Sequence, residues 1–177
     1  MVVLLVLILV PQTGKPIKVA LHKLISFAPS QIATQKQQQL DSYNWPLQTL
    51  QGNAVNFDQS KGRVVVLNLW ATWCPPCIAE MPSFQALYDA YGDHVDFYFV
   101  TSEEPARVQA FLDKKGYTFP VFIKQYAAPN MLENNSLPTT YVINKAGAIQ
   151  INKTGAANWN SDSVKELLNN LIATPIN

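Results

Sequence analysis

Cysteine, histidine and charged residues are scarce in this sequence. Its 177 residues include two cysteines and two histidines, only 14% are charged, and the net charge is +1. Two cysteines are too few for a disulfide framework. The near-neutral charge argues against a dedicated nucleic-acid binder, which would carry a basic excess. Hydrophobic residues, in contrast, make up 48% of the chain, and a content this high excludes wholesale disorder.

Charge divides the chain into two unequal parts. Residues 1–40 hold four lysines and no acidic residue, whereas residues 41–177 hold nine basic and twelve acidic residues. A chain of this length is expected to form one domain, with or without an appendage. We therefore predict a cationic leader at residues 1–29, a glutamine-rich linker at residues 30–43 and one globular domain at residues 44–177.

The leader combines an apolar run with a short amphipathic helix. Residues 1–10 read MVVLLVLILV, and as a helix they would extend about 15 Å, roughly half of a bilayer core. In residues 16–28 the apolar side chains share one helical face and the lysines lie opposite, which suits a membrane surface. No basic n-region or small-residue cleavage site marks a secretory signal. We expect the remnant of a membrane anchor; the alternatives are a buried strand or helix for residues 1–10 and a helix docked on the main domain for residues 16–28.

The pattern of the main domain alternates between strands and helices. Two buried strands are expected, at 63–70 and 95–101, and a third strand is expected at 119–123. Two hairpins are expected, at 45–57 and 139–153. Helices are expected from Pro75, from Ser102–Pro105, at 128–134, and through Leu171 with Ser163 and Glu166 as a capping box. This order predicts an α/β fold in which helices cover both faces of a mixed sheet.

The two cysteines lie together in Trp73-Cys74-Pro75-Pro76-Cys77, at the predicted start of a helix that follows a buried strand. Free N–H groups and the positive end of the helix dipole favour a thiolate at Cys74 and lower its pKa. The prolines lose no needed N–H in the first turn, and they fix the turn so that the two sulfurs can face each other. Cys77 is expected to be less exposed and can resolve a mixed disulfide formed at Cys74.

Two other uses of the cysteine pair are an inert structural disulfide and a metal site. A disulfide that closes so small a loop would restrict the unfolded chain little. A zinc site usually needs four protein ligands, and His22 and His94 are isolated in the sequence. The pair therefore favours redox chemistry.

Two motifs carry a resemblance to a known family. Residues 70–82, Trp-Ala-Thr-Trp-Cys-Pro-Pro-Cys-Ile-Ala-Glu-Met-Pro, resemble the active-site stretch of the thioredoxin superfamily. More narrowly, they resemble the TlpA/ResA-like, membrane-anchored, extracytoplasmic thiol–disulfide oxidoreductases. Residues 137–144, Leu-Pro-Thr-Thr-Tyr-Val-Ile-Asn, resemble that family's second motif. The resemblance implies a thioredoxin-like mixed sheet flanked by helices, an N-terminal β-hairpin extension, and no cofactor or metal besides the redox-active cysteine pair.

The resemblance also implies site residues beyond the cysteines. Pro138 is expected in the cis form beside the cysteine pair, a form that costs little only at proline. The backbone of Leu137 would then be free to pair with an extended substrate segment, as a sheet edge does. We expect Trp73, Pro75 and Pro76 to complete the substrate-binding surface.

Two positions separate branches of the superfamily. Thioredoxins carry a buried Asp two residues before the first tryptophan, where this chain has Asn68, which cannot take a proton. The TlpA/ResA-like pattern has an acid three residues after the second cysteine, and Glu80 matches it. We expect a partly buried Glu80 with a raised pKa to exchange a proton with Cys77. The alternative is a surface glutamate that the helix dipole favours.

The activity implied by the resemblance is the reduction of protein disulfides outside the cytoplasm, for example during cytochrome c maturation. The expected partners are protein disulfides, a membrane thiol–disulfide reductant as electron donor, and the membrane itself, with no nucleic acid. The lysines that follow the apolar run argue against this location, because positive charges next to a membrane segment favour keeping that part of the chain inside the cell. Cys-Pro-Pro-Cys does not determine the direction of electron flow, so a thiol oxidase or isomerase of the same fold stays open, as does a copper metallochaperone.

Overall fold

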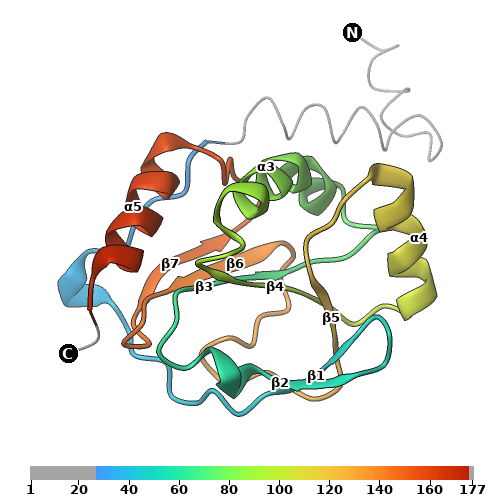
Figure 1. Ribbon diagram of the computed structural model, residues 1–177, viewed down its shortest axis with the longest axis horizontal. Helices are drawn as coiled ribbons and strands as arrows, with labels where there is room; N and C mark the ends of the chain where they lie inside the picture. Colours follow the sequence, from blue (N-terminus) through green and yellow to red (C-terminus); the bar gives the residue numbers. More distant parts are fainter. Residues whose placement is uncertain (1–26, 176–177) are drawn as a thin grey trace, which may run out of the picture.

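A seven-stranded mixed sheet forms the centre of the computed structural model, which describes residues 27–175 (Figure 1). Its strands lie in the order β2-β1-β5-β4-β3-β6-β7. Their bounds are β1 Pro46–Thr49, β2 Ala54–Asn56, β3 Val65–Leu69, β4 Asp96–Thr101, β5 Val121–Lys124, β6 Thr139–Ile143 and β7 Ile149–Thr154. The other elements are α3 Pro75–Tyr91, α4 Pro105–Lys115, α5 Asp162–Ala173 and the 3-10 turns η1 Thr34–Lys36 and η2 Phe57–Ser60.

Strands β3, β4 and β6 form the buried middle of the sheet. Every residue of β3 and β6 is buried, as the continuous apolar, β-branched run in β3 predicts for a strand covered on both faces. Strands β3, β4 and β5 are parallel, while β6 is antiparallel to β3. Hairpin β1–β2 pairs with β5 on one side of the sheet, and β7 pairs with β6 on the other side. The two buried strands, the third strand and both hairpins are therefore confirmed, and β5 is only alternately buried.

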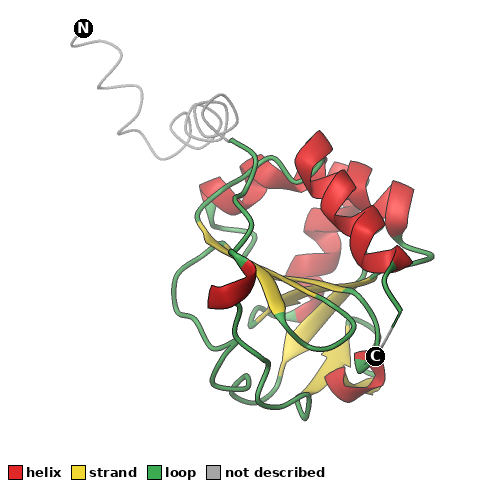
Figure 2. Ribbon diagram, turned by 90° about the vertical axis from the view of Figure 1, so that its left-hand side faces the viewer, coloured by secondary structure: helices red, strands yellow, loops and turns green. Residues whose placement is uncertain are grey.

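The three helices pack on the same face of the sheet (Figures 1 and 2). The buried side chains of α3, α4 and α5 form one cluster with Val66, Phe99 and Val142 of the sheet. The prediction of helices on both faces is wrong for the described residues. The reason lies in the strand order: β3, β4 and β5 follow one another in a single direction, and right-handed crossovers then place α3 and α4 on one side.

Loops and turns cover the opposite face, where a second buried cluster contains Trp45, Phe57 and Leu132. The helix expected at 128–134 is wrong, because this stretch forms only a turn in which Leu132 N–H donates to the Pro129 carbonyl at 2.8 Å. The Glu133 carboxylate accepts the Ala128 N–H of the same stretch.

The expected capping box of the last helix is also wrong. Helix α5 begins at Asp162 with Ser161 as its N-cap, two residues before the expected cap. The Ser161 hydroxyl makes no capping bond to the backbone and instead lies 3.2 Å from the Ser163 hydroxyl. Ser163 is the second residue of the helix and therefore cannot be its N-cap.

The predicted leader falls mainly outside the described residues. The apolar run at 1–10 and positions 16–26 of the amphipathic segment are not described, and residues 27 and 28 are not helical. Within residues 27–175, no helix is long and apolar enough to cross a membrane. The segment expected as a linker contacts the main domain along the edge of β7: Ile32 N–H donates to the Gln150 carbonyl and Leu40 N–H to the Gly147 carbonyl, each at 2.8 Å.

Candidate active site

Cys74 and Cys77 lie where β3 passes into α3. Cys74 is the N-cap of α3, and Pro75 and Pro76 occupy its first turn, where the absent N–H groups have no helical partner to lose. A disulfide joins the two cysteines, whose Cα atoms are 5.3 Å apart. The Cys77 N–H donates to Cys74 Sγ at 3.3 Å. On reduction this N–H and the helix dipole favour negative charge on the Cys74 sulfur.

The residues in and around the cysteine pair differ strongly in solvent exposure. Both cysteines are buried, Pro75 and Pro76 are half-buried, and the Trp73 side chain is 58% exposed. A large indole that stands in solvent beside a reactive sulfur offers apolar contact area to an approaching polypeptide. The structure therefore places Trp73, Pro75 and Pro76 together around Cys74, at the mouth of α3.

The Leu137–Pro138 peptide bond is cis and lies at the same end of the sheet. Thr139 pairs with Leu69 across β6 and β3, so Pro138 comes level with the loop that carries the cysteines. Pro138 is buried, and its carbonyl accepts the Gly155 N–H at 2.9 Å. Within the described residues, the N–H and carbonyl of Leu137 make no hydrogen bond. These two groups are free to pair with an extended segment of another chain.

Glu80 lies one turn beyond Cys77 and is only 1% exposed. Its Oε2 accepts from the indole N–H of Trp159 at 2.8 Å and from the backbone N–H of Ala157 at 3.2 Å. Its Oε1 accepts from the Asn68 amide at 2.9 Å. Burial raises the pKa of Glu80 to about 8, against the lowering effect of the hydrogen bonds from Trp159, Ala157 and Asn68 and of the Lys153 charge. Glu80 is therefore a buried carboxyl group and not a surface residue.

Asn68 completes the surroundings of Glu80. The second N–H of its amide donates to the Thr140 hydroxyl at 2.8 Å, while its Oδ1 is buried without a partner. A side chain placed in this way presents one donor to Glu80 and favours the carboxylate form. Asn68 therefore occupies the position of the acidic residue of thioredoxins but cannot act as a base. It donates a hydrogen bond to the Glu80 carboxyl group and takes up no proton.

Trp159 and Ala157 are site residues that the sequence alone did not indicate. They lie in the loop between β7 and α5, more than 70 positions from Glu80, and the ring of Trp159 stacks on Phe84 of α3 at 5.0 Å. A tryptophan in a polar loop is the only local sign of a specific role. Only the packing of this loop against α3 shows which acceptor its indole reaches.

We expect Trp159→Phe to raise the pKa of Glu80 further. Phenylalanine keeps the stacking on Phe84 but removes a donor to the ionised carboxylate, and a hydrogen bond to a charged group is worth about 1.5–3 kcal/mol, or one pKa unit and more. The midpoint is measured by ¹³C NMR titration of the Glu80 carboxyl carbon.

Trp45→Phe is the matched control for this titration. Trp45 is equally buried, donates through its indole N–H to the Tyr126 carbonyl at 3.1 Å, and belongs to the cluster on the opposite face. Trp45→Phe should leave the midpoint of the Glu80 titration unchanged. Equal midpoints in wild type and Trp159→Phe would show that the indole hydrogen bond does not act on Glu80.

Metal-ligating side chains are not gathered at this site. Within residues 27–175, no group of three or more His, Cys, Asp or Glu side chains is placed to hold a metal ion. His94 is exposed beyond the C-terminal end of α3, at the opposite end from the cysteines. The described residues thus add no third ligand to the cysteine pair.

Comparison with known proteins agrees with this geometry. Residues 38–151 match the sequence pattern of the AhpC/TSA family. Thioredoxin-like protein YneN of Bacillus subtilis (strain 168) is 34% identical over 129 residues, covering 71% of this chain and 75% of YneN. Thiol-disulfide oxidoreductase ResA of Halalkalibacterium halodurans is 37% identical over 117 residues, covering 63% of this chain and 65% of ResA, so the match spans somewhat less than two thirds of that relative. Among solved structures, the pneumococcal exposed lipoprotein thioredoxin Etrx1 of Streptococcus pneumoniae strain TIGR4 is 25% identical with a TM-score of 0.56, covering 72% of this chain and 99% of Etrx1.

Proposed function

This chain belongs to the AhpC/TSA family and is a thioredoxin-like thiol–disulfide oxidoreductase, and from this premise we propose that it reduces disulfide bonds of other proteins outside the cytoplasm. The observation that carries the proposal is the Cys74–Cys77 pair at the mouth of α3, with the Cys77 N–H directed at Cys74 Sγ. Free backbone groups at Leu137 and the exposed Trp73 provide a surface on which an extended polypeptide can lie.

The proposed reaction runs in two exchange steps. The Cys74 thiolate attacks one sulfur of a substrate disulfide, forming a mixed disulfide and releasing the other substrate sulfur as a thiolate. Cys77 then gives its thiol proton to the Glu80 carboxylate and attacks Cys74 Sγ. The second substrate sulfur leaves as a thiolate. The substrate disulfide has gained two electrons and becomes two thiols, and the enzyme dithiol has become the Cys74–Cys77 disulfide.

A membrane dithiol protein is the proposed electron donor that returns the enzyme to the reduced form. Its exchange with the Cys74–Cys77 disulfide supplies the two electrons of each cycle. The leader at residues 1–29 would hold the enzyme at the membrane, and the description of Etrx1 as an exposed lipoprotein supports an extracytoplasmic place for this chain. Apocytochrome c cysteines, as used in cytochrome c maturation, are a suitable substrate of this class. The redox centre of the proposed cycle is the cysteine pair itself.

The direction of electron flow is tested by the reduction potential of the Cys74–Cys77 couple. For a reductase we expect a value nearer to that of thioredoxin, about −270 mV, than to that of a strong oxidant, about −120 mV. The potential is measured by equilibration with glutathione buffers, and insulin reduction is followed in parallel. A strongly oxidising potential without insulin reduction would identify a thiol oxidase of the same fold.

A further inference from the structure

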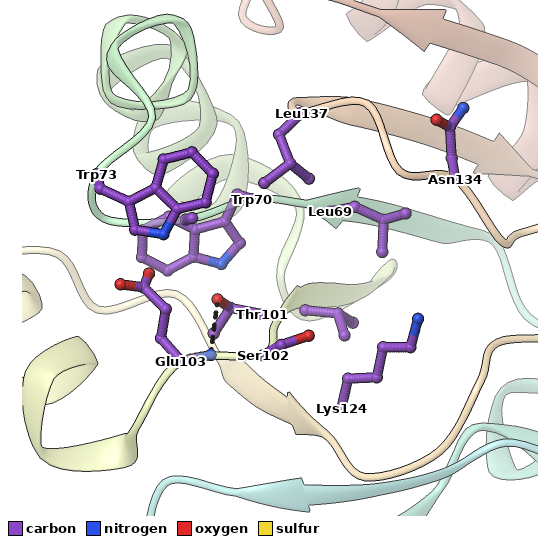
Figure 3. Close-up of a pocket in the computed structure, with 11 residues that line it drawn as sticks. Leu69, Trp70, Trp73, Thr101, Ser102, Glu103, Lys124, Asn134 and Leu137 are labelled. Carbon is purple, nitrogen blue, oxygen red and sulfur yellow. Dashed lines mark hydrogen bonds between the residues drawn. The ribbon is translucent and has the colours of Figure 1, made fainter.

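Glu103 lies in the loop between β4 and α4, across from the loop that carries the cysteines. Figure 3 shows its side chain extending from that loop toward the side on which Trp70 and Trp73 lie. One carboxylate oxygen accepts the Thr72 backbone N–H at 2.5 Å, and the other accepts the Thr72 hydroxyl at 2.8 Å. The Glu103 side chain is only 10% exposed. A single carboxylate, largely shielded from solvent, therefore accepts hydrogen bonds from both donors of Thr72.

Thr72 stands two positions before Cys74, in the connection between β3 and α3. Loops are more mobile than the helices and strands that they connect. Two charge-assisted hydrogen bonds to the same residue fix its orientation as well as its distance. Arg107 of α4 lies 3.7 Å from the same carboxylate and partly offsets its charge. The loop that carries Cys74 is thus hydrogen-bonded, through Thr72 and Glu103, to the loop that follows the neighbouring parallel strand β4.

We propose that Glu103 is a positioning residue for thiol–disulfide exchange: by holding Thr72, it keeps Cys74 Sγ at the N-cap of α3, where the Cys77 N–H donates to it. This proposal rests on the proposed function. Glu103 does not touch the reacting sulfurs and acts through Thr72. If the loop moves, Cys74 leaves the donor that favours its thiolate, and attack on a disulfide becomes slower.

The test compares Glu103→Ala with Glu103→Gln in the reduced protein. Alanine removes both bonds. Glutamine can rebuild them, because its carbonyl accepts the Thr72 N–H and its amide donates to the Thr72 hydroxyl. We expect Glu103→Ala to slow iodoacetamide alkylation of Cys74 at pH 7 about tenfold and to move its pH profile to higher pH, with Glu103→Gln close to wild type. Thr72→Val, which loses only the hydroxyl contact, should lie between them and serves if Glu103→Ala does not fold.

Glu133→Ala is the matched control for this test. Glu133 also accepts a backbone N–H, that of Ala128 at 2.5 Å, and a side-chain donor, Lys124 at 2.6 Å, but it lies in the loop after β5. Glu133→Ala should lower the midpoint of urea unfolding without changing the pH profile of Cys74 alkylation.

Two results would overturn the proposal: a wild-type profile in both Glu103→Ala and Thr72→Val, or a Glu103→Gln profile as shifted as that of Glu103→Ala. Alkylation needs no protein substrate, so a wild type that fails to reduce insulin would contradict the proposed function and leave the role of Glu103 standing.

Discussion

Cys74→Ser should reduce disulfide exchange to the rate seen without enzyme, whereas Cys77→Ser should attack a disulfide once and remain joined to its substrate. Cys74 Sγ lies at the N-cap of α3 and accepts a backbone N–H, so it is the sulfur that the fold favours as a thiolate. Serine keeps the size of the side chain but lacks a nucleophilic sulfur at neutral pH. Without Cys77, no second sulfur is placed to release the substrate.

The two variants are compared in the native cell by trapping and mass spectrometry. Proteins are isolated with each variant on non-reducing gels, released with dithiothreitol and identified. We expect many partners on Cys77→Ser and none on Cys74→Ser, with the double variant as the control for non-covalent association. Trapping on Cys74→Ser alone would reverse the assignment of the two cysteines. The identities of the trapped proteins also test whether apocytochrome c is a substrate.

The cysteine pair could be predicted from the sequence because its chemistry is local. A buried strand, a tight connection and a helix start with two prolines together determine where Cys74 lies, and all three are visible in residues 65–77 of the sequence. The central strands and the two hairpins could be predicted for the same reason. Their apolar runs and turn residues act within a few positions of one another.

The contacts that tune the site depend on tertiary packing and could not be predicted. Glu80 owes its raised pKa to burial beneath a loop that comes 77 positions later, and Thr72 is held by Glu103 from 31 positions away. No short pattern specifies which acceptor a loop tryptophan or a loop glutamate will reach. The one-sided arrangement of helices likewise follows from the strand order, which local propensities do not encode.

Glu80→Gln should slow the resolution of the mixed disulfide about 100-fold near pH 8, because the Cys77 thiol loses its proton acceptor. In the wild type, resolution should accelerate as Glu80 ionises, with a midpoint near its pKa of about 8. The variant should lack this rise and approach the wild type only when the Cys77 thiol ionises unaided. Resolution is followed by stopped flow after mixing with a chromogenic disulfide. Glu166→Gln, an exposed change on α5, is the control. An unchanged pH profile in Glu80→Gln would exclude the proton transfer.

The same substitution should change how stability depends on pH. Glutamine can keep the contacts of Glu80, since a turn of the Asn68 amide would direct its unpartnered Oδ1 to the new N–H group. In the wild type, the folded state holds a proton on Glu80 that the unfolded state releases above its ordinary pKa of 4.5, and the folded state releases it only near 8. The free energy of unfolding should therefore fall through this window as pH rises, by about 5 kcal/mol from this group. Urea unfolding at several pH values should show that the free energy of unfolding of Glu80→Gln rises relative to that of the wild type as the pH increases from about 4.5 to about 8. A difference that stays constant over this range would contradict the raised pKa.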